Sequence, residues 1–295
     1  MNALVSRKSR HLCSAVLTAE GAKTIAKSFR FKFNYYAGRD LFTCNEQVKL
    51  QYESARKNLD AQNLKFFGFH LVEDFVQPED QQTLTAFIES ITTWGHRRKV
   101  SDGGRSLTFG VNFHEKTYKI KSFTQIPPIL RQYGKKAMRR ALEIKDLSTY
   151  ACRPVNSNNP PSVDQIFLNR YTKGQSLGFH FDGRREFGEI ICGVSLHSDS
   201  TLLLGSTSGS AEVASEVEKR KTVVAVRIPK NSLYVFSGMS RYDLRHAVRH
   251  GESTPRHSIT FRSVSDEVRQ TRKYREHTQR VPALESQRAG LISSV

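Results

Sequence analysis

The feature that most constrains the fold is a series of eight short β-type segments between residues 163 and 264. Each is rich in branched or aromatic side chains and is followed by turn residues, and no helical periodicity separates them. The segments read VDQIFLNRY, SLGFHF, EIICGVSL, TLLLGS, TVVAVRI, SLYVFSG, LRHAVRH and RHSITFRSV. Eight short strands in about a hundred residues predict a double-sheet jelly roll.

Helices are expected ahead of these strands. A strand-like run at 64–72 precedes Pro78, which suits the first position of a helix. The apolar residues that follow have the helical spacing i, i+3, i+4 and i+7. They are Leu84, Phe87, Ile88 and Ile91. A second helix is predicted over 126–143, and the turn-rich segment 153–162 follows it. The predicted class is therefore α+β and mainly β: a double-stranded β-helix (jelly roll) core with flanking N-terminal helices.

The charge of the chain indicates its kind of partner. It carries 46 Lys and Arg against 28 Asp and Glu, which gives a net charge of +18. Residues 1–39 contribute +7 and the charged tail of residues 265–295 contributes +2, which leaves +9 on the body. A field of this sign favours polyanions such as nucleic acid. No run of about 18 apolar residues occurs, so we expect no membrane span.

The basic leader of residues 1–45 is almost free of acidic residues and lacks an apolar signal core. This composition matches a mitochondrial transit peptide. The alternative is a disordered basic arm that contacts RNA. The four cysteines form no C-x-x-C pair, which is typical of an intracellular protein. We therefore expect a mitochondrial location, with the nucleus or cytoplasm as alternatives.

Two H-x-D tripeptides are candidates for a metal site. Two His and one carboxylate hold Fe(II) in non-haem oxygenases, and residues i and i+2 of a strand share a face. The tripeptides are His180-Phe181-Asp182 and His197-Ser198-Asp199. The third ligand must come from a distant strand, where His246 and His250 are both candidates. The motif alone leaves these choices open.

The last β segment, RHSITFR, alternates along its length. It places Arg256, Ser258, Thr260 and Arg262 on one face. Inward-facing arginines are costly unless each meets an anion, and a dicarboxylate bound beside a metal would satisfy both. Upstream, Asn169 and Tyr171 also share a strand face and could hydrogen-bond the same ligand.

The string NRYTKGQSLGFHFD, followed by RHAV and RHSITFR, resembles the AlkB family of Fe(II)/2-oxoglutarate dioxygenases. The resemblance covers residues 64–264, with the jelly roll at about 163–264. In that family the ligand His follows the Asn of an N-x-Y strand by eleven residues, as His180 follows Asn169. The resemblance therefore implies Fe(II) bound by His180, Asp182 and His246, with 2-oxoglutarate and O2 as cosubstrates.

The same resemblance implies how 2-oxoglutarate would be bound. Arg256 pairs with its C5 carboxylate, helped by Tyr171, and Asn169 bonds its C1 carboxylate. Arg262 supports the C1 end and Asp182. Ser258 stands where the family usually has Asn, and it can still donate one hydrogen bond.

Residues 96–121 mix cations with aromatic residues, and in the family this region forms a lid over the nucleic acid. Cations suit phosphates and aromatic rings suit an extruded base. The alternative is a β-hairpin whose aromatic residues belong to the core. Arg184 stands two residues after the ligand Asp, where DNA-repair members have an acidic or amide group. The candidate substrate residues are Arg97, Arg98, Lys99, Phe109, Phe113, Tyr118 and Arg184.

The expected function is oxidative demethylation of N-methylated bases in nucleic acid, with RNA favoured over DNA. The alternative is 2-oxoglutarate-dependent hydroxylation of a protein side chain or of a modified tRNA base. The expected partner is nucleic acid without a membrane, and the protein is expected to be a monomer.

Overall fold

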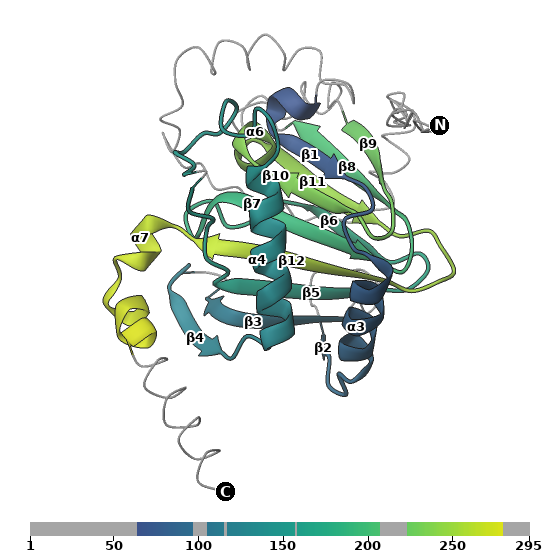
Figure 1. Cartoon of the computed structure of the whole chain (residues 1–295), viewed down its shortest axis with the longest axis horizontal. Helices are drawn as coiled ribbons and strands as arrows, with labels where there is room; N and C mark the ends of the chain where they lie inside the picture. Colours follow the sequence, from purple (N-terminus) through teal and green to yellow (C-terminus); the bar gives the residue numbers. More distant parts are fainter. Residues whose placement is uncertain (1–63, 97–104, 115–116, 157, 207–222, 280–295) are drawn as a thin grey trace, which may run out of the picture.

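The structure is a computed structural model that describes residues 64–96, 105–114, 117–156, 158–206 and 223–279 (Figure 1). The basic leader, the predicted substrate residues Arg97, Arg98 and Lys99, and the end of the C-terminal tail lie outside these ranges. Within them, no helix is both long and apolar enough to cross a membrane.

The larger of two antiparallel sheets has eight strands. Seven follow the order β1-β10-β7-β12-β5-β3-β2, and β4 pairs with β3. Their bounds are β1 (Phe69–Val72), β2 (Gly95–His96), β3 (Arg105–Phe113), β4 (Ile120–Thr124), β5 (Gln165–Tyr171), β7 (Phe187–Leu196), β10 (Leu233–Phe236) and β12 (Arg256–Val264). The last strand, β12, therefore lies inside the sheet, between β7 and β5 (Figure 1).

The smaller sheet has four strands in the order β6-β11-β8-β9. They are β6 (Ser176–His180), β8 (Ser200–Ser206), β9 (Val223–Ile228) and β11 (Leu244–Arg249). Each of the eight segments predicted between residues 163 and 264 overlaps one strand of the two sheets, although β7 and β8 begin slightly earlier than predicted. The prediction of a mainly β, antiparallel fold is thus confirmed.

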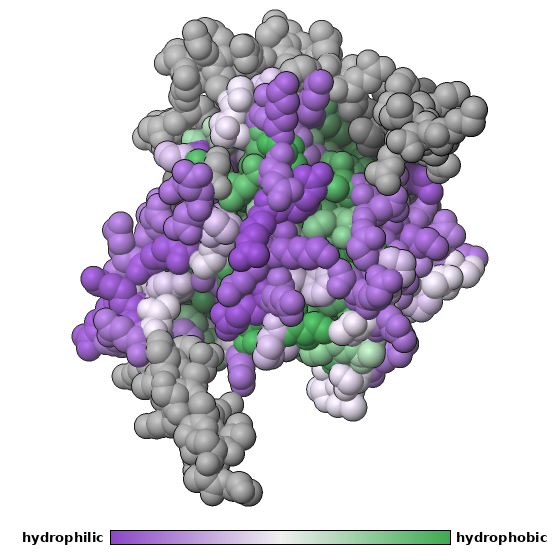
Figure 2. All heavy atoms as spheres, in the orientation of Figure 1, coloured by the Kyte–Doolittle hydropathy of each residue, from purple (hydrophilic) through white to green (hydrophobic). Residues whose placement is uncertain are grey.

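Both predicted N-terminal helices are present, as α3 (Pro78–Glu89) and α4 (Pro128–Leu142). The helix α4 lies along the outer face of the large sheet, against β7 and β12 (Figure 1). A Cβ at Gly134 would lie 2.7 Å from the Phe261 side chain and 2.8 Å from Val163, so glycine permits this close approach. Figure 2 shows hydrophilic residues along the exposed side of α4, as an amphipathic helix requires.

Two local predictions were wrong. The run at 64–72 begins as a 3-10 helix, η1 (Leu64–Phe67), and becomes β1 only after Gly68. Gly68 has a φ of +79°, and a Cβ there would lie 2.2 Å from the Ser237 carbonyl oxygen. The β segments are also not free of helix, because α6 (Gly238–Tyr242) lies between β10 and β11. All five of its residues are buried, so α6 has no amphipathic pattern to detect. A short helix, α7 (Asp266–Arg269), follows β12, and residues 272–279 are helical as well.

Candidate metal centre and cosubstrate pocket

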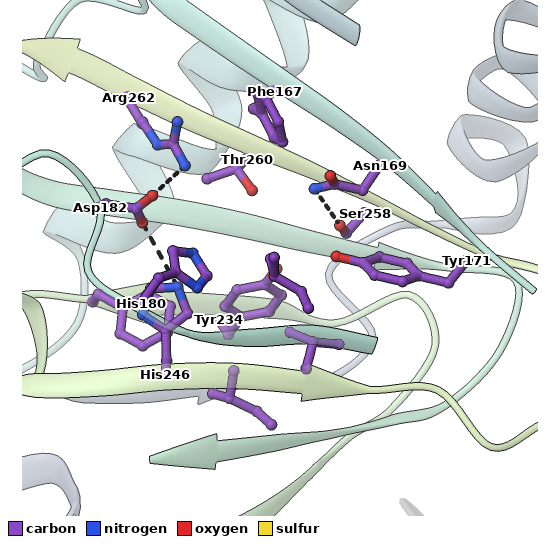
Figure 3. A pocket seen from close by; sticks show the side chains of 14 residues that line it. Phe167, Asn169, Tyr171, His180, Asp182, Tyr234, His246, Ser258, Thr260 and Arg262 are labelled. Carbon is purple, nitrogen blue, oxygen red and sulfur yellow. Dashed lines mark hydrogen bonds and ion pairs between the residues drawn. The ribbon is translucent and has the colours of Figure 1, made fainter. Parts of the chain in front are cut away.

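A pocket lies between the two sheets, and its lining comes from both (Figure 3). The large sheet contributes residues of β5, β10 and β12, and the small sheet contributes residues of β6, β8 and β11. The lining residues are Phe167, Asn169, Tyr171, Leu177, His180, Asp182, Leu202, Tyr234, Phe236, His246, Val248, Ser258, Thr260 and Arg262.

Three predicted metal ligands meet at one end of this pocket. His180 ends β6 and is opposite His246 in the register of β6 and β11. Asp182 follows two residues later, and its Oδ2 lies 3.8 Å from Nε2 of His246. One ligand atom from each of the three lies within 4.8 Å of the others, and this is the one such group among the described residues. Two imidazoles and a carboxylate match the ligand set of non-haem Fe(II).

The surroundings favour the metal-binding protonation states of Asp182 and His246. Burial alone would raise the pKa of the Asp182 carboxyl, but Arg262 and the two histidines hold it well below its usual range. Burial is the main cause that lowers the pKa of His246 well below 6.5, and the nearby His180 adds to the effect. Neutral imidazole and ionised carboxylate are the forms that bind metals. Nδ1 of His180 lies 2.8 Å from the Gly178 carbonyl oxygen. Donation from Nδ1 to that oxygen leaves Nε2 for a metal.

Arg256 fits an anionic cosubstrate. Its side chain is 1% exposed, and its Nε donates to Ser195 Oγ over 3.0 Å. Its guanidinium carbon lies 5.2 Å from the centroid of the Tyr171 ring. Nη1 of Arg256 is buried and has no hydrogen-bond partner among the described residues. A buried cation with an unused donor matches a carboxylate such as the C5 end of 2-oxoglutarate.

The other predicted cosubstrate residues lie on neighbouring strands. Asn169 and Ser258 are paired in the register of β5 and β12, and Asn169 Nδ2 donates to Ser258 Oγ over 3.4 Å. Arg262 donates from Nη2 to Asp182 Oδ1 and from Nη1 to Gln165 Oε1, the latter over 2.7 Å (Figure 3). Arg262 thus orients the ligand carboxylate, and its own position is fixed by Gln165.

The second H-x-D pair lies apart from this centre. Nε2 of His197 is 2.8 Å from Thr85 Oγ1 on α3, and its Nδ1 is 2.9 Å from Nδ1 of His257. Asp199 forms an ion pair with Arg227. The alternative third ligand, His250, is fully buried, with Nε2 2.9 Å from the Thr254 carbonyl oxygen. The structure therefore brings together His180, Asp182 and His246 and separates the competitors from them.

The pair of His197 and His257 leads to a pH-dependence prediction. Burial lowers the pKa of His257 to about 3, and His197 adds to the effect. His257 stays neutral in the folded protein but takes up a proton near pH 6.5 in the unfolded chain. Its contribution to the free energy of unfolding is therefore complete above pH 6.5. Below that it falls by up to about 1.4 kcal/mol per pH unit, until the folded pKa is reached. Urea unfolding should show that the wild type exceeds His257→Gln in free energy of unfolding most at pH 7, and that this excess shrinks towards pH 4. A difference independent of pH would contradict this assignment.

The structure describes four of the candidate substrate residues. Phe109 and Phe113 lie on β3 of the hairpin formed with β4, and both pack against buried clusters. The rings of Phe113 and Phe187 meet edge to face at 5.4 Å. This packing is what the alternative of a core hairpin predicts. Tyr118, in the hairpin loop, is 40% exposed. Roles in substrate binding for these residues stay predictions.

Arg184 lies beside the ligand loop, among other arginines. Its guanidinium carbon is 3.5 Å from the centroid of the Phe181 ring, and that of Arg245 is 5.2 Å from the same centroid. Burial and the charges of Arg241 and Arg245 lower the pKa of Arg184 to about 10. Three cationic side chains therefore gather next to two metal ligands, Asp182 and His246.

Sequence reasoning missed two residues that support the site. Arg241 of α6 is buried, and it donates from Nη1 to the Asp182 carbonyl oxygen (2.9 Å) and from Nη2 to that of Gly183 (2.6 Å). Tyr234 lines the pocket opposite Gly193, where a Cβ would lie 2.1 Å from its ring. For Tyr234, the alternation of Tyr234 and Phe236 in SLYVF was the available signal. Arg241 depends on a helix that the sequence pattern does not reveal.

Comparison with known proteins agrees with this geometry. The family model described as the 2OG-Fe(II) oxygenase superfamily matches residues 68–278. The tRNA (carboxymethyluridine(34)-5-O)-methyltransferase alkbh8 of Xenopus tropicalis is 25% identical over 181 residues, which are 61% of this chain and 25% of that protein. This chain thus spans about a quarter of that relative's length. Human alpha-ketoglutarate-dependent dioxygenase alkB homolog 4 is 27% identical over 226 residues, with 68% of each chain covered.

Among solved structures, that of OsALKBH1 has a TM-score of 0.50 at 18% identity, and the match covers 66% of this chain and 96% of that one. This likeness supports the fold. The family match covers most of the chain, and the His-Asp-His centre fits Fe(II). The chain therefore belongs to the 2OG-Fe(II) oxygenase superfamily, whose members depend on Fe(II) and 2-oxoglutarate, and within it the chain is similar to AlkB homologues.

Proposed function

We propose that the protein oxidatively demethylates N-methylated bases in nucleic acid, with RNA preferred over DNA. The observation that carries the proposal is the group of arginines beside the metal ligands, Arg184, Arg241 and Arg245. Their charge suits a polyanionic substrate, in keeping with a net charge of +18 on the whole chain. The Xenopus relative is named as a tRNA methyltransferase, which supports RNA as the substrate class.

The metal ligands, which line the pocket, and the buried Arg256, which shares a face of β12 with the lining residue Ser258, would have separate roles. His180, Asp182 and His246 would hold the metal, and Arg256 would hold the far carboxylate of 2-oxoglutarate. When bound, Fe(II) and 2-oxoglutarate supply with O2 the oxidising power to hydroxylate an N-methyl carbon, which then leaves as formaldehyde. Succinate and CO2 are the other products, so atoms and electrons balance. The two sheets bury the side chains of Asp182 and Arg256 and most of that of His246.

A second candidate is hydroxylation of a modified tRNA base without loss of a methyl group. The name of the Xenopus relative, which specifies a modified uridine of tRNA, favours this alternative over a protein substrate. It uses the same metal centre and cosubstrate, and it differs in the product nucleoside.

A substrate panel tests both. The Fe(II)-loaded protein is incubated with 2-oxoglutarate and with methylated RNA oligonucleotides, matched DNA oligonucleotides, tRNA and a histidine- and lysine-rich peptide mixture. Nucleoside mass spectrometry and succinate release are measured. Demethylation of RNA above DNA is the expected result. A hydroxylated nucleoside with its carbon count unchanged would favour the second candidate. Oxidation of the peptides alone would contradict both.

A further inference from the structure

We propose that Arg184, Arg245 and the ring of Phe181 form a phosphate subsite. It would bind the phosphodiester next to the nucleotide that is oxidised. The inference rests on the proposed function and adds to it the place where the nucleic-acid backbone is held.

The first support is the way that the two arginines share one ring. The guanidinium carbons of Arg184 and Arg245 lie 3.5 and 5.2 Å from the centroid of Phe181. Both distances fall within the range of about 6 Å for cation–π contacts. The aromatic face offsets part of the cost of holding two like charges close together. It carries no net charge, however, so the repulsion between the arginines is not cancelled.

The second support is an unused hydrogen-bond donor. Arg184 is half-buried, and its Nε is buried without a hydrogen-bond partner among the described residues. Within the same ranges, no ion pair joins Arg184 to an acidic side chain, while the charges of Arg241 and Arg245 act on it. A half-buried cation with a free donor and like-charged neighbours is stabilised by an anion with several acceptor oxygens.

The third support is the position of these residues relative to the metal centre. Arg184 follows the ligand Asp182 by two residues, and Arg245 directly precedes the ligand His246. Arg241 fixes the loop between them through the carbonyl oxygens of Asp182 and Gly183. Neither Arg184 nor Arg245 lines the pocket between the sheets. Arg256, by contrast, shares its face of β12 with Ser258, which does line the pocket. Arg245 lies on the face of β11 opposite to His246, because successive residues of a strand point to opposite faces. An anion held by Arg184 and Arg245 is therefore distinct from 2-oxoglutarate, and its residues are one and two positions along the chain from metal ligands.

Phosphate contacts position a strand without reading its sequence. A subsite at the ligand loop would therefore set the register of the strand, so that one base stands over the metal whatever its neighbours are. Phosphates are the recurrent anions of a nucleic-acid strand, and the planar guanidinium of arginine suits them.

The test is a scan of neutral linkages. A single-stranded RNA oligonucleotide with one methylated base is made with each phosphate near that base replaced, in turn, by an uncharged methylphosphonate. For the wild-type holoenzyme, one linkage beside the methylated nucleotide should lower kcat/KM about tenfold. Arg184→Gln should lower kcat/KM by a similar factor on the strand whose phosphates are all charged. The neutral linkage should cause no further fall in kcat/KM for this variant. Arg185→Gln, which removes the adjacent exposed cation, is the matched control and should keep the wild-type pattern.

A binding measurement separates the subsite from the reaction. Fluorescence anisotropy with an unmethylated single strand, over a series of salt concentrations, gives the slope of log affinity against log salt. Loss of one phosphate contact should reduce this slope by about 0.7 in Arg184→Gln and leave it unchanged in Arg185→Gln. Thermal melting checks that both variants are folded.

The outcomes distinguish a failure of the phosphate subsite from a failure of the proposed function. If the neutral linkage and Arg184→Gln lower kcat/KM independently, so that their factors multiply, the subsite is wrong and the proposed function stands. If no oligonucleotide is oxidised, the proposed function fails and the salt slope alone decides on the subsite. An unchanged slope in Arg184→Gln overturns the subsite in either case.

Discussion

Replacing Asp182 by Ala should abolish the Fe(II)-dependent conversion of 2-oxoglutarate to succinate. Asp182 supplies the carboxylate among the three residues that can hold the metal, and Arg262 holds it in place. Loss of an outer-shell partner costs about 10- to 100-fold in metal affinity or activity, so loss of a ligand should exceed about 100-fold. Succinate release measures the activity, and titration with Mn(II), followed calorimetrically, measures metal binding independently of turnover.

The chain provides its own control for this experiment. Asp199 ends the second H-x-D tripeptide, but it pairs with Arg227 and lies outside the metal centre. Asp199→Ala should therefore retain most of the turnover and the Mn(II) affinity. If Asp199→Ala lost the activity while Asp182→Ala kept it, the register that places His180 opposite His246 would be wrong.

Replacing Arg256 by Met should weaken 2-oxoglutarate binding and leave the metal bound. Hydrogen bonds to a charged group contribute about 1.5–3 kcal/mol, so the KM for 2-oxoglutarate should rise roughly 10- to 150-fold. Without cosubstrate, the variant should melt at the same temperature as the wild type or higher, because an uncompensated buried charge has been removed. Added 2-oxoglutarate should then raise its melting temperature less than that of the wild type.

Arg249→Met is the control, since Arg249 is exposed on β11. It should leave both the KM and the cosubstrate-dependent rise in melting temperature unchanged. An unchanged KM in Arg256→Met would show that another residue binds the far carboxylate. A fall in melting temperature without cosubstrate would show that the hydrogen bond to Ser195 and the contact with Tyr171 outweigh the cost of the buried charge.

The sequence was most informative about strands. The eight segments after residue 163 were found because each alternates or is continuously apolar between turn residues, and these signals are local. The spacing from Asn169 to His180, taken with the family resemblance, chose the H-x-D pair that lies beside His246. The alternation in RHSITFR placed Ser258, Thr260 and Arg262 on one face, and all three line the pocket.

What the sequence did not reveal depends on contacts between distant segments. Arg241 supports the Asp182 loop from α6, whose buried residues give no periodic pattern. The hydrogen bond between His197 and His257 joins a turn to β12 and could not be read from either alone. The aromatic residues of β3 show the same limit. Phe109 and Phe113 lie in a segment of mixed character, and only the packing reveals that they contact buried clusters.

The central place of β12 has a consequence for synthesis on the ribosome. This strand is the last of the two sheets along the chain, yet it pairs on both sides, with β5 and with β7. Until it has left the exit tunnel, a nascent chain keeps two long strands with unpaired backbone groups facing each other across a gap. Such edges readily pair with other chains. A premature stop shortly before residue 256 should therefore give an aggregating polypeptide in place of a smaller soluble domain.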